Sequence, residues 1–295
     1  MKTLLWLALL AGTAAAQPAD PSKVEIKIVK LAGSVSMLEG SGGNIGVSVG
    51  DDGVFLIDDQ FAPLTPKIRA AVETLSKKPL RFVFNTHWHG DHTGGNENLA
   101  NAGAIVVAHD NVRKRLSSEQ FMSLMNRHFP PAPARALPIV TFNDEVTFHL
   151  NGDEIHVFHV ARAHTDGDAI VHFRKANVVH TGDVFLSAGY PLVDVDSGGT
   201  FDGFIAAADR LLAITDAQTR IIPGHGPPAD RARLAAWREM LVTVRARVKK
   251  LADAGKKLDE IKAAKPTADL DGEWAKGFIK PELVVDFAYK SVTAK

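Results

Sequence analysis

The densest group of reactive side chains in the sequence lies just after an apolar stretch. Three histidines and one aspartate fall within six residues: His87, His89, Asp91 and His92. Imidazole and carboxylate groups are ligands that suit Zn²⁺ and related divalent ions. His87 and His89 are two residues apart, so they point to the same side of an extended segment, whereas Asp91 and His92 lie in the turn beyond. Four donors in so short a loop are too strained to surround one tetrahedral ion, so we expect them to be divided between two ions.

Three later residues are suited to complete two such sites. His164, Asp183 and His225 each lie in a glycine-containing loop that follows a predicted strand. In a layered α/β fold such loops gather at one edge, where binding sites form. We therefore expect these three side chains to meet the first four in space.

The elements that must position these residues follow from hydrophobic periodicity. Alternating and short apolar runs, separated by glycines, predict strands, and apolar residues at helical spacing predict helices. Strands are expected at 24–28, 34–38, 45–49, 54–57, 80–85, 105–108, 146–150, 154–161, 169–173, 178–180 and 220–222. Helices are expected at 66–75, 98–101, 109–127, 204–212, 229–255, 257–264 and 281–292. Two β-rich halves with helices outside predict an α/β fold, a four-layer αβ/βα sandwich of two mixed sheets flanked by helices.

The N-terminus has the pattern of a secretory signal peptide. Residues 1–16 contain Lys2, a short apolar core and an Ala-x-Ala cleavage signal, which predicts a secreted or periplasmic protein. No other run is long and apolar enough to cross a bilayer, so no stable membrane insertion is expected after cleavage. We expect residues 17–228 to form the main domain and residues 229–295 a helical extension packed on it.

Composition narrows the function further. The 295 residues contain 34 Lys+Arg and 34 Asp+Glu, so there is no overall basic field to attract nucleic acid. Cysteine is absent, which excludes a disulfide, a thiolate metal ligand and a cysteine nucleophile. A small-molecule substrate is the partner that we expect, and the oligomeric state is left open.

The motif His87-Trp88-His89-Gly90-Asp91-His92, followed by His164, Asp183 and His225, resembles that of the metallo-β-lactamase-fold hydrolases. The H-x-H-x-D-H pattern and the three downstream ligand motifs match in order, over about residues 24–226. The resemblance is specific for fold and metal site, and much less so for substrate.

Position by position, the resemblance implies a role for each ligand. One metal is held by His87, His89 and His164, and a second by Asp91, His92 and His225, with Asp183 as the bridge between them. Asp58 matches an early aspartate that supports the ligands from behind, a role for which its neighbour Asp59 is the weaker candidate. Two Zn²⁺ ions are expected, with Fe or Mn as alternatives.

This ligand set implies a reaction. A hydroxide that bridges the two metals attacks a carbonyl carbon of an ester, lactone, thioester or lactam, and the catalytic residue Asp91 handles the proton. The Thr-Gly-Asp around Asp183 is similar to the glyoxalase II and lactone hydrolase groups. Three alternatives remain: a periplasmic metallo-β-lactamase proper, a mononuclear-iron redox enzyme like the sulfur dioxygenases, and a non-catalytic metal-binding module.

Two aromatic residues are candidate substrate contacts. Tyr190 follows Asp183 by seven residues and is placed to hydrogen-bond a substrate carbonyl, although packing in its loop explains it equally well. Trp88 is either a packing residue or part of the site mouth. Asp194 and Asp196, in the loop 190–199, are expected only to cap turns. That loop and the loop 130–138 are the segments that we expect to gate substrate.

Overall fold

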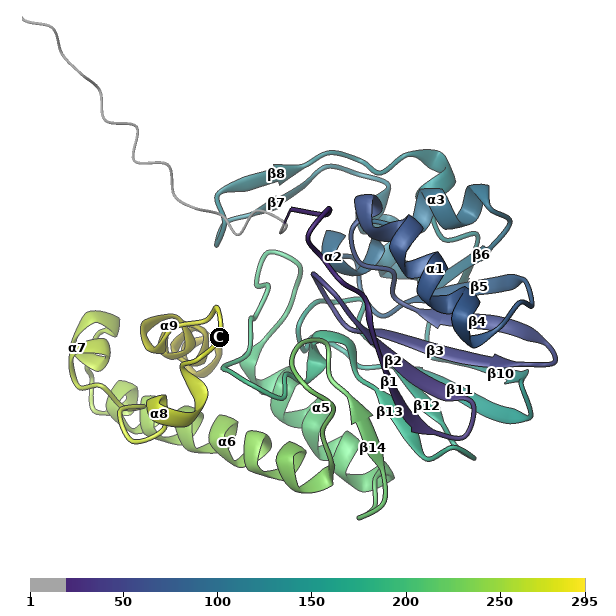
Figure 1. Cartoon of the computed structure of the whole chain (residues 1–295). Helices are drawn as coiled ribbons and strands as arrows, with labels where there is room; N and C mark the ends of the chain where they lie inside the picture. The colour runs from purple at the N-terminus through teal and green to yellow at the C-terminus, as the bar shows by residue number, and fades with distance from the viewer. Residues whose placement is uncertain (1–19, 295) are drawn as a thin grey trace, which may run out of the picture.

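Two β-sheets lie face to face in the computed structural model, with helices on both outer surfaces (Figure 1). The structure describes residues 20–294, so the predicted signal peptide, residues 1–16, lies outside the described range. Side chains from both sheets, among them Phe55, Phe84, Val157 and Phe173, form one buried hydrophobic cluster between them. The four-layer sandwich expected from the sequence is confirmed.

The first sheet has seven strands in the order β1-β2-β3-β4-β5-β6-β9. The strands β1 to β4 form an antiparallel meander, and β4, β5, β6 and β9 run parallel. Because the parallel strands end at one edge, the loops after β4 and β5 lie side by side there. The strands are β1 Lys27–Ala32, β2 Val35–Glu39, β3 Ile45–Gly50, β4 Gly53–Ile57, β5 Leu80–Asn85, β6 Ile105–His109 and β9 Val140–Phe142.

The second sheet has five strands in the order β10-β11-β12-β13-β14. The strands β11, β13 and β14 share one direction, since β12 is antiparallel to both neighbours and β13 is parallel to β14. Their carboxyl ends therefore open onto a common edge. The strands are β10 Glu145–Leu150, β11 Asp153–His159, β12 Ala169–Phe173, β13 Val178–His180 and β14 Arg220–Ile222.

Helices cover the outer faces of both sheets. Ile68 and Val72 of α1 and Leu99 of α3 bury their side chains against the first sheet. Phe204 of α5 and Trp237 of α6 belong to a larger cluster on the second sheet, which also includes residues of α9. The helices are α1 Thr65–Leu75, α2 Gly90–Thr93, α3 Asn96–Asn101, α4 Asp110–Leu116, α5 Phe201–Ile214, α6 Arg231–Asp253, α7 Leu258–Ala263, α8 Asp271–Trp274 and α9 Pro281–Thr293.

One expected helix is wrong in its second half. The predicted helix 109–127 ends at Leu116, and the chain then forms the hairpin of β7 (Gln120–Met122) and β8 (Arg127–Phe129). The hydroxyl groups of Ser117 and Ser118 both donate to the carbonyl oxygen of Lys114, which caps the helix where the sequence was expected to continue it. The hairpin packs Met122 against Trp88.

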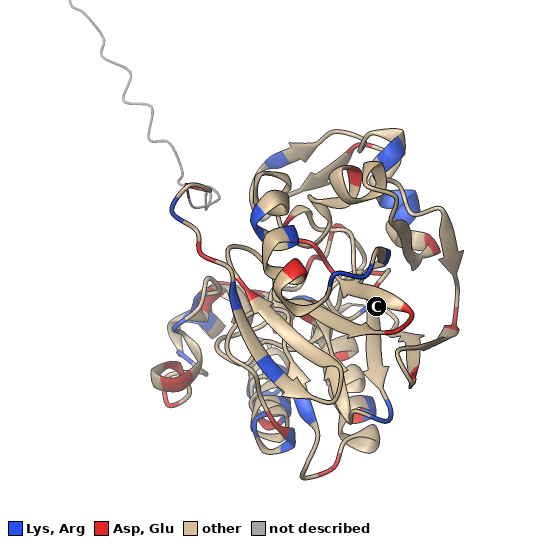
Figure 2. Ribbon diagram, turned by 45° about the vertical axis from the view of Figure 1, so that its right-hand side comes forward, with Lys and Arg blue, Asp and Glu red and all other residues tan. Residues whose placement is uncertain are grey.

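Lysine and arginine residues are interspersed with acidic residues along the ribbon (Figure 2). Several cations are paired, including Arg115 with Asp166 and Arg245 with Asp202. Within residues 20–294, none of the helices combines the length and apolar character needed to span a membrane.

Candidate metal centre

The first group of donors comes from loops of both sheets. His87 and His89 follow β5, His164 follows β11, and Asp183 lies in a 3-10 helix after β13. One donor atom from each of these four residues lies within 4.8 Å of the others. We call this set the first cluster; its members are almost fully buried.

Each histidine of the first cluster has one ring nitrogen engaged away from the centre. His164 Nδ1 donates to the carbonyl oxygen of Leu192 at 2.7 Å, and His89 Nε2 donates to Asp194 Oδ2 at 3.0 Å. The remaining nitrogens, His164 Nε2 and His89 Nδ1, are then both unprotonated in the neutral rings, yet they lie only 2.8 Å apart. Two lone pairs that face each other at this distance repel unless a proton or a metal ion lies between them. His87 Nε2 is buried there without a hydrogen-bond partner, so the set fits a divalent metal ion.

The second cluster consists of Asp91, His92 and His225. Asp91 and His92 lie in the short helix α2, and His225 follows β14. His225 Nε2 is 3.3 Å from Asp91 Oδ2 and 3.4 Å from His92 Nε2. This is a second convergent set of oxygen and nitrogen donors that suits a divalent ion.

Asp183 belongs to the first cluster and also lies beside the second. Its Oδ1 is 3.2 Å from His92 Nε2 and 3.4 Å from His225 Nε2, whereas its Oδ2 is 3.7 Å from His164 Nε2. Oδ1 is buried and has no hydrogen-bond partner. Asp183 is therefore placed to offer one oxygen to each cluster, and the structure brings together the seven residues that the sequence predicts as metal ligands.

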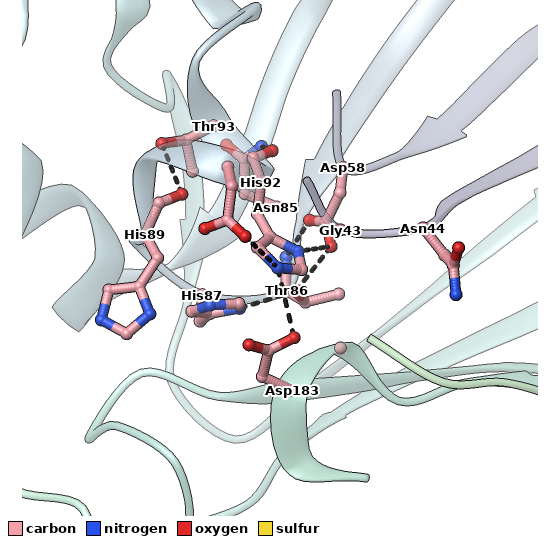
Figure 3. A network of polar contacts seen from close by, with 12 residues as sticks. Gly43, Asn44, Asp58, Asn85, Thr86, His87, His89, His92, Thr93 and Asp183 are labelled. Carbon is pink, nitrogen blue, oxygen red and sulfur yellow. Dashed lines mark hydrogen bonds and ion pairs between the residues drawn. The ribbon is translucent and has the colours of Figure 1, made fainter. Parts of the chain in front are cut away.

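Asp58 supports both clusters from one buried position at the end of β4 (Figure 3). Its Oδ2 accepts hydrogen bonds from His92 Nδ1 and from Thr86 Oγ1, both at 2.8 Å. Since the Thr86 hydroxyl proton goes to Asp58, its oxygen accepts from His87 Nδ1 at 3.0 Å. One carboxylate thus directs His92 Nε2 to the second cluster and, through Thr86, His87 Nε2 to the first. Asp59 instead accepts from the backbone N–H of Gly95.

The two clusters differ in their protonation. Burial and the neighbouring histidines lower the pKa of His87 well below its usual range, and they lower the pKa of His164 to about 4. These rings are neutral at pH 7 and have lone pairs available. In the second cluster burial acts in the same direction, but the charges of Asp183 and Asp91 outweigh it and raise the pKa of His225 to about 10. Without metal, protons therefore balance the carboxylates of the second cluster.

Two glycines allow the backbone to approach the ligands closely. A Cβ at Gly43 would lie 2.1 Å from the ring of His92, and one at Gly224 would lie 2.0 Å from Asp183 Oδ1. Asn44, next to Gly43, donates its side-chain amide to the carbonyl oxygens of Pro223 and Gly226, which fixes the two loops against each other.

The centre is open on the side of the second cluster. The side chain of His225 is 39% exposed and that of Asp91 is 27% exposed, whereas the side chain of His164 is 1% exposed. A substrate would therefore meet Asp91 and His225 before it met the first cluster.

The two predicted aromatic contacts have other partners. Tyr190 is buried, and its hydroxyl donates to Asp271 of α8 at 2.7 Å, so a contact between this hydroxyl and substrate would require that bond to break. Trp88 is also buried and donates its Nε1 proton to Ser197 Oγ at 3.0 Å. Its ring packs edge-on against Phe129 of the hairpin. Both substrate contacts remain predictions.

Sequence reasoning missed two supporting residues. Asp194 was expected only to cap a turn, but its carboxylate binds His89 although 105 residues separate them. Thr86 precedes the motif and was assigned no role. Thr86 could have been found from its place between a strand and the motif, whereas no local signal points from Asp194 to His89.

A family model for the metallo-beta-lactamase superfamily matches residues 38–225, which contain both clusters. The chain belongs to the metallo-beta-lactamase superfamily. It has two groups of histidine and aspartate side chains that could each hold a metal ion, and the resemblance noted in the sequence is confirmed.

A curated relative in the superfamily is a hydroxyacylglutathione hydrolase from Erythrobacter litoralis (strain HTCC2594). It is 28% identical over 159 residues, which cover 52% of this chain and 51% of that protein. The chain spans about half the length of the hydroxyacylglutathione hydrolases that it matches.

Solved structures show the same fold. The sec-alkylsulfatase Pisa1 from Pseudomonas sp. has a TM-score of 0.69 at 19% identity, over 90% of this chain and 50% of that one. The DIM-1 metallo-beta-lactamase has a TM-score of 0.60 at 20% identity, over 75% of this chain and 99% of that one.

Proposed function

We propose that the protein is an exported dinuclear zinc hydrolase that attacks the carbonyl group of a small ester, lactone, thioester or lactam. The observation that carries this proposal is the position of Asp183. Its two oxygens face different clusters, at 3.2 Å from His92 Nε2 and 3.7 Å from His164 Nε2. A carboxylate so placed suits two ions that share it as a bridging ligand.

The chemistry divides between metal and protein. When bound, a pair of divalent ions lowers the pKa of a water molecule and stabilises negative charge on a substrate oxygen. Asp91 lies on the open side of the centre, with a side chain that is 27% exposed and Oδ2 at 3.3 Å from His225 Nε2. It can orient the attacking water, accept its proton and return a proton to the leaving group.

The substrate class rests on chemistry and on relatives. A thioester is supported by the similarity to hydroxyacylglutathione hydrolases, and a lactam or lactone by the same electrophilic carbonyl carbon. The balanced charge, 34 basic against 34 acidic residues, offers no field for a polyanionic substrate.

The test is turnover by the metal-loaded protein on a panel with a β-lactam, a lactone, a thioester, a carboxylic ester and a phosphodiester. We expect chelator-sensitive hydrolysis of one carbonyl class, two zinc ions per chain by elemental analysis, and loss of turnover in Asp91→Ala. Intact hydrolysis in Asp91→Ala would contradict the proton role. One iron per chain with oxygen uptake would favour a redox enzyme, and bound metal without any turnover would favour a binding module.

Export is proposed from residues 1–16 alone. N-terminal sequencing of the protein recovered from a periplasmic fraction should begin at Gln17. Recovery of the uncleaved chain from the cytoplasm would contradict export without affecting the hydrolase proposal.

A further inference from the structure

Asp194 connects the loop 190–199 to two ligands of the first cluster. Its side chain is 1% exposed, and Oδ2 accepts from His89 Nε2 at 3.0 Å. Its Oδ1 accepts from the backbone N–H of Ser197 at 3.1 Å, and its own backbone N–H donates to the carbonyl oxygen of His164 at 3.1 Å. One carboxylate oxygen is thus bonded within its own loop, and the other accepts the hydrogen bond from His89.

This contact decides which nitrogen of His89 can bind a metal. A neutral imidazole carries one proton, and a carboxylate can only accept it. Asp194 therefore keeps the proton on His89 Nε2 and leaves the lone pair on Nδ1, which lies 2.8 Å from His164 Nε2 within the first cluster. The opposite tautomer would place a proton at the metal position.

The loop that carries Asp194 is itself fixed by the C-terminal extension. Leu192 and Val195 pack against the hydrophobic cluster that contains Val284 and Phe287 of α9. Leu192 also accepts from His164 Nδ1 through its carbonyl oxygen. Two ligands of the first cluster are therefore oriented by a loop that rests on the helical extension.

We propose that Asp194 is a positioning residue of the metal centre, which selects Nδ1 of His89 as the donor and so sets the metal affinity of the first cluster. This inference deepens the proposed function, since it rests on a metal being bound there. Support of a ligand histidine by an outer carboxylate is typical of metal sites, and its loss usually costs 10- to 100-fold in metal affinity.

The variant Asp194→Asn tests the tautomer directly. An NH₂ group on the side of Ser197 would face its backbone N–H, donor against donor, so the amide oxygen of the new side chain stays there and its NH₂ group faces His89 Nε2. The NH₂ group donates where the carboxylate accepted, so the proton of His89 moves to Nδ1. The change keeps the size of the side chain and the bond within the loop.

A matched control is Asp196→Asn, two residues along the same loop. Asp196 accepts from the backbone N–H of Ser123 at 2.6 Å and contacts no ligand histidine among residues 20–294. Ser197→Ala is a second control, since it removes the bond from Trp88 to the loop but keeps the backbone N–H that Asp194 needs.

The measurements are zinc titration by calorimetry and ¹⁵N–¹H correlation spectra of the histidine rings. For Asp194→Asn we expect about 10- to 100-fold weaker binding of one zinc equivalent, whereas both controls bind as the parent does. In the zinc-loaded parent we expect the proton of His89 on Nε2.

Parental zinc affinity in Asp194→Asn, or a His89 proton on Nδ1 in the zinc-loaded parent, would overturn the proposal. Equal loss of affinity in the controls would also overturn it, because general loosening of the loop would then be the cause. The parent spectrum needs no variant, so it can refute the proposal even if Asp194→Asn does not fold. Neither readout uses a substrate, so a protein that binds zinc but hydrolyses nothing would refute the hydrolase proposal alone.

Discussion

Gly224 offers a sharp test of the position assigned to Asp183. A Cβ at residue 224 would lie 2.0 Å from Asp183 Oδ1 and 2.6 Å from the backbone carbon of Gly182. Ordinary contact begins at 3.4 Å, so in Gly224→Ala the carboxylate oxygen must move by about 1.4 Å. Because Oδ1 lies only 3.2 Å from His92 Nε2, this shift withdraws the shared ligand from the second cluster.

The expected cost follows from that displacement. A misplacement of about 1 Å lowers rates by about 10²-fold, and overpacking of a buried contact costs about 1–3 kcal/mol of unfolding free energy. We therefore expect Gly224→Ala to bind one zinc equivalent more weakly, to lose about 10²-fold in kcat/KM and to melt at a lower temperature. The assays are zinc titration, turnover of whichever substrate the panel identifies, and thermal unfolding.

Gly272→Ala is the matched control for this substitution. Gly272 lies in α8, and a Cβ there would meet nothing within 4 Å. Alanine favours a helix over glycine by about 1 kcal/mol, so this variant should retain parental zinc binding and turnover and unfold no earlier. If Gly224→Ala also retained parental zinc binding, Asp183 would not be the shared ligand that the structure indicates.

Three further predictions concern the same centre. Asp58→Ala should lower the affinity for both zinc equivalents by about 10- to 100-fold, since Asp58 orients His92 directly and His87 through Thr86. Calorimetry resolves the two binding steps, and a loss of affinity at one site alone would refute this shared role. As the pH falls from 8 to 6, zinc binding should weaken for one equivalent only. His225, whose pKa is raised to about 10, must release a proton on binding, whereas His164, whose pKa is lowered to about 4, is already neutral. Calorimetric titration in buffers of different ionisation enthalpy counts the protons released. Tyr190→Phe removes the bond to Asp271 and should cost about 1 kcal/mol in chemical denaturation with little change in kcat/KM, whereas a large loss of kcat/KM would show that the hydroxyl contacts substrate.

The residues that converge in the two clusters could be predicted from the sequence because their signal is local. Four of them lie within six residues, and each of the others follows a strand whose apolar pattern is clear. The chain reversal at Ser117 and Ser118 was missed, since the apolar residues beyond it also fit helical spacing. Their hydroxyl bonds to Lys114 decide where the helix ends.

The surroundings of the ligands are a product of tertiary structure. Asp194 reaches His89 across 105 residues, and Gly43 lies against His92 only because two loops of the first sheet meet. Neither residue stands in a pattern that periodicity or motif spacing could recognise. Tyr190 is the opposite case. Its place in the sequence suggested a contact with substrate, but its hydroxyl donates to Asp271 of the C-terminal extension.

Because the predicted ligands come from loops of both sheets, a metal bound at the centre would also cross-link the two sheets. His87, His89, Asp91 and His92 follow β5 of the first sheet, whereas His164, Asp183 and His225 follow strands of the second. A metal that binds only the folded chain at 1,000 times its Kd adds about 4.1 kcal/mol to the free energy of unfolding. In a chain without cysteine, a bound metal would thus link the two sheets as a disulfide links segments of other proteins, and chelation should let the two halves of the sandwich separate at a lower temperature.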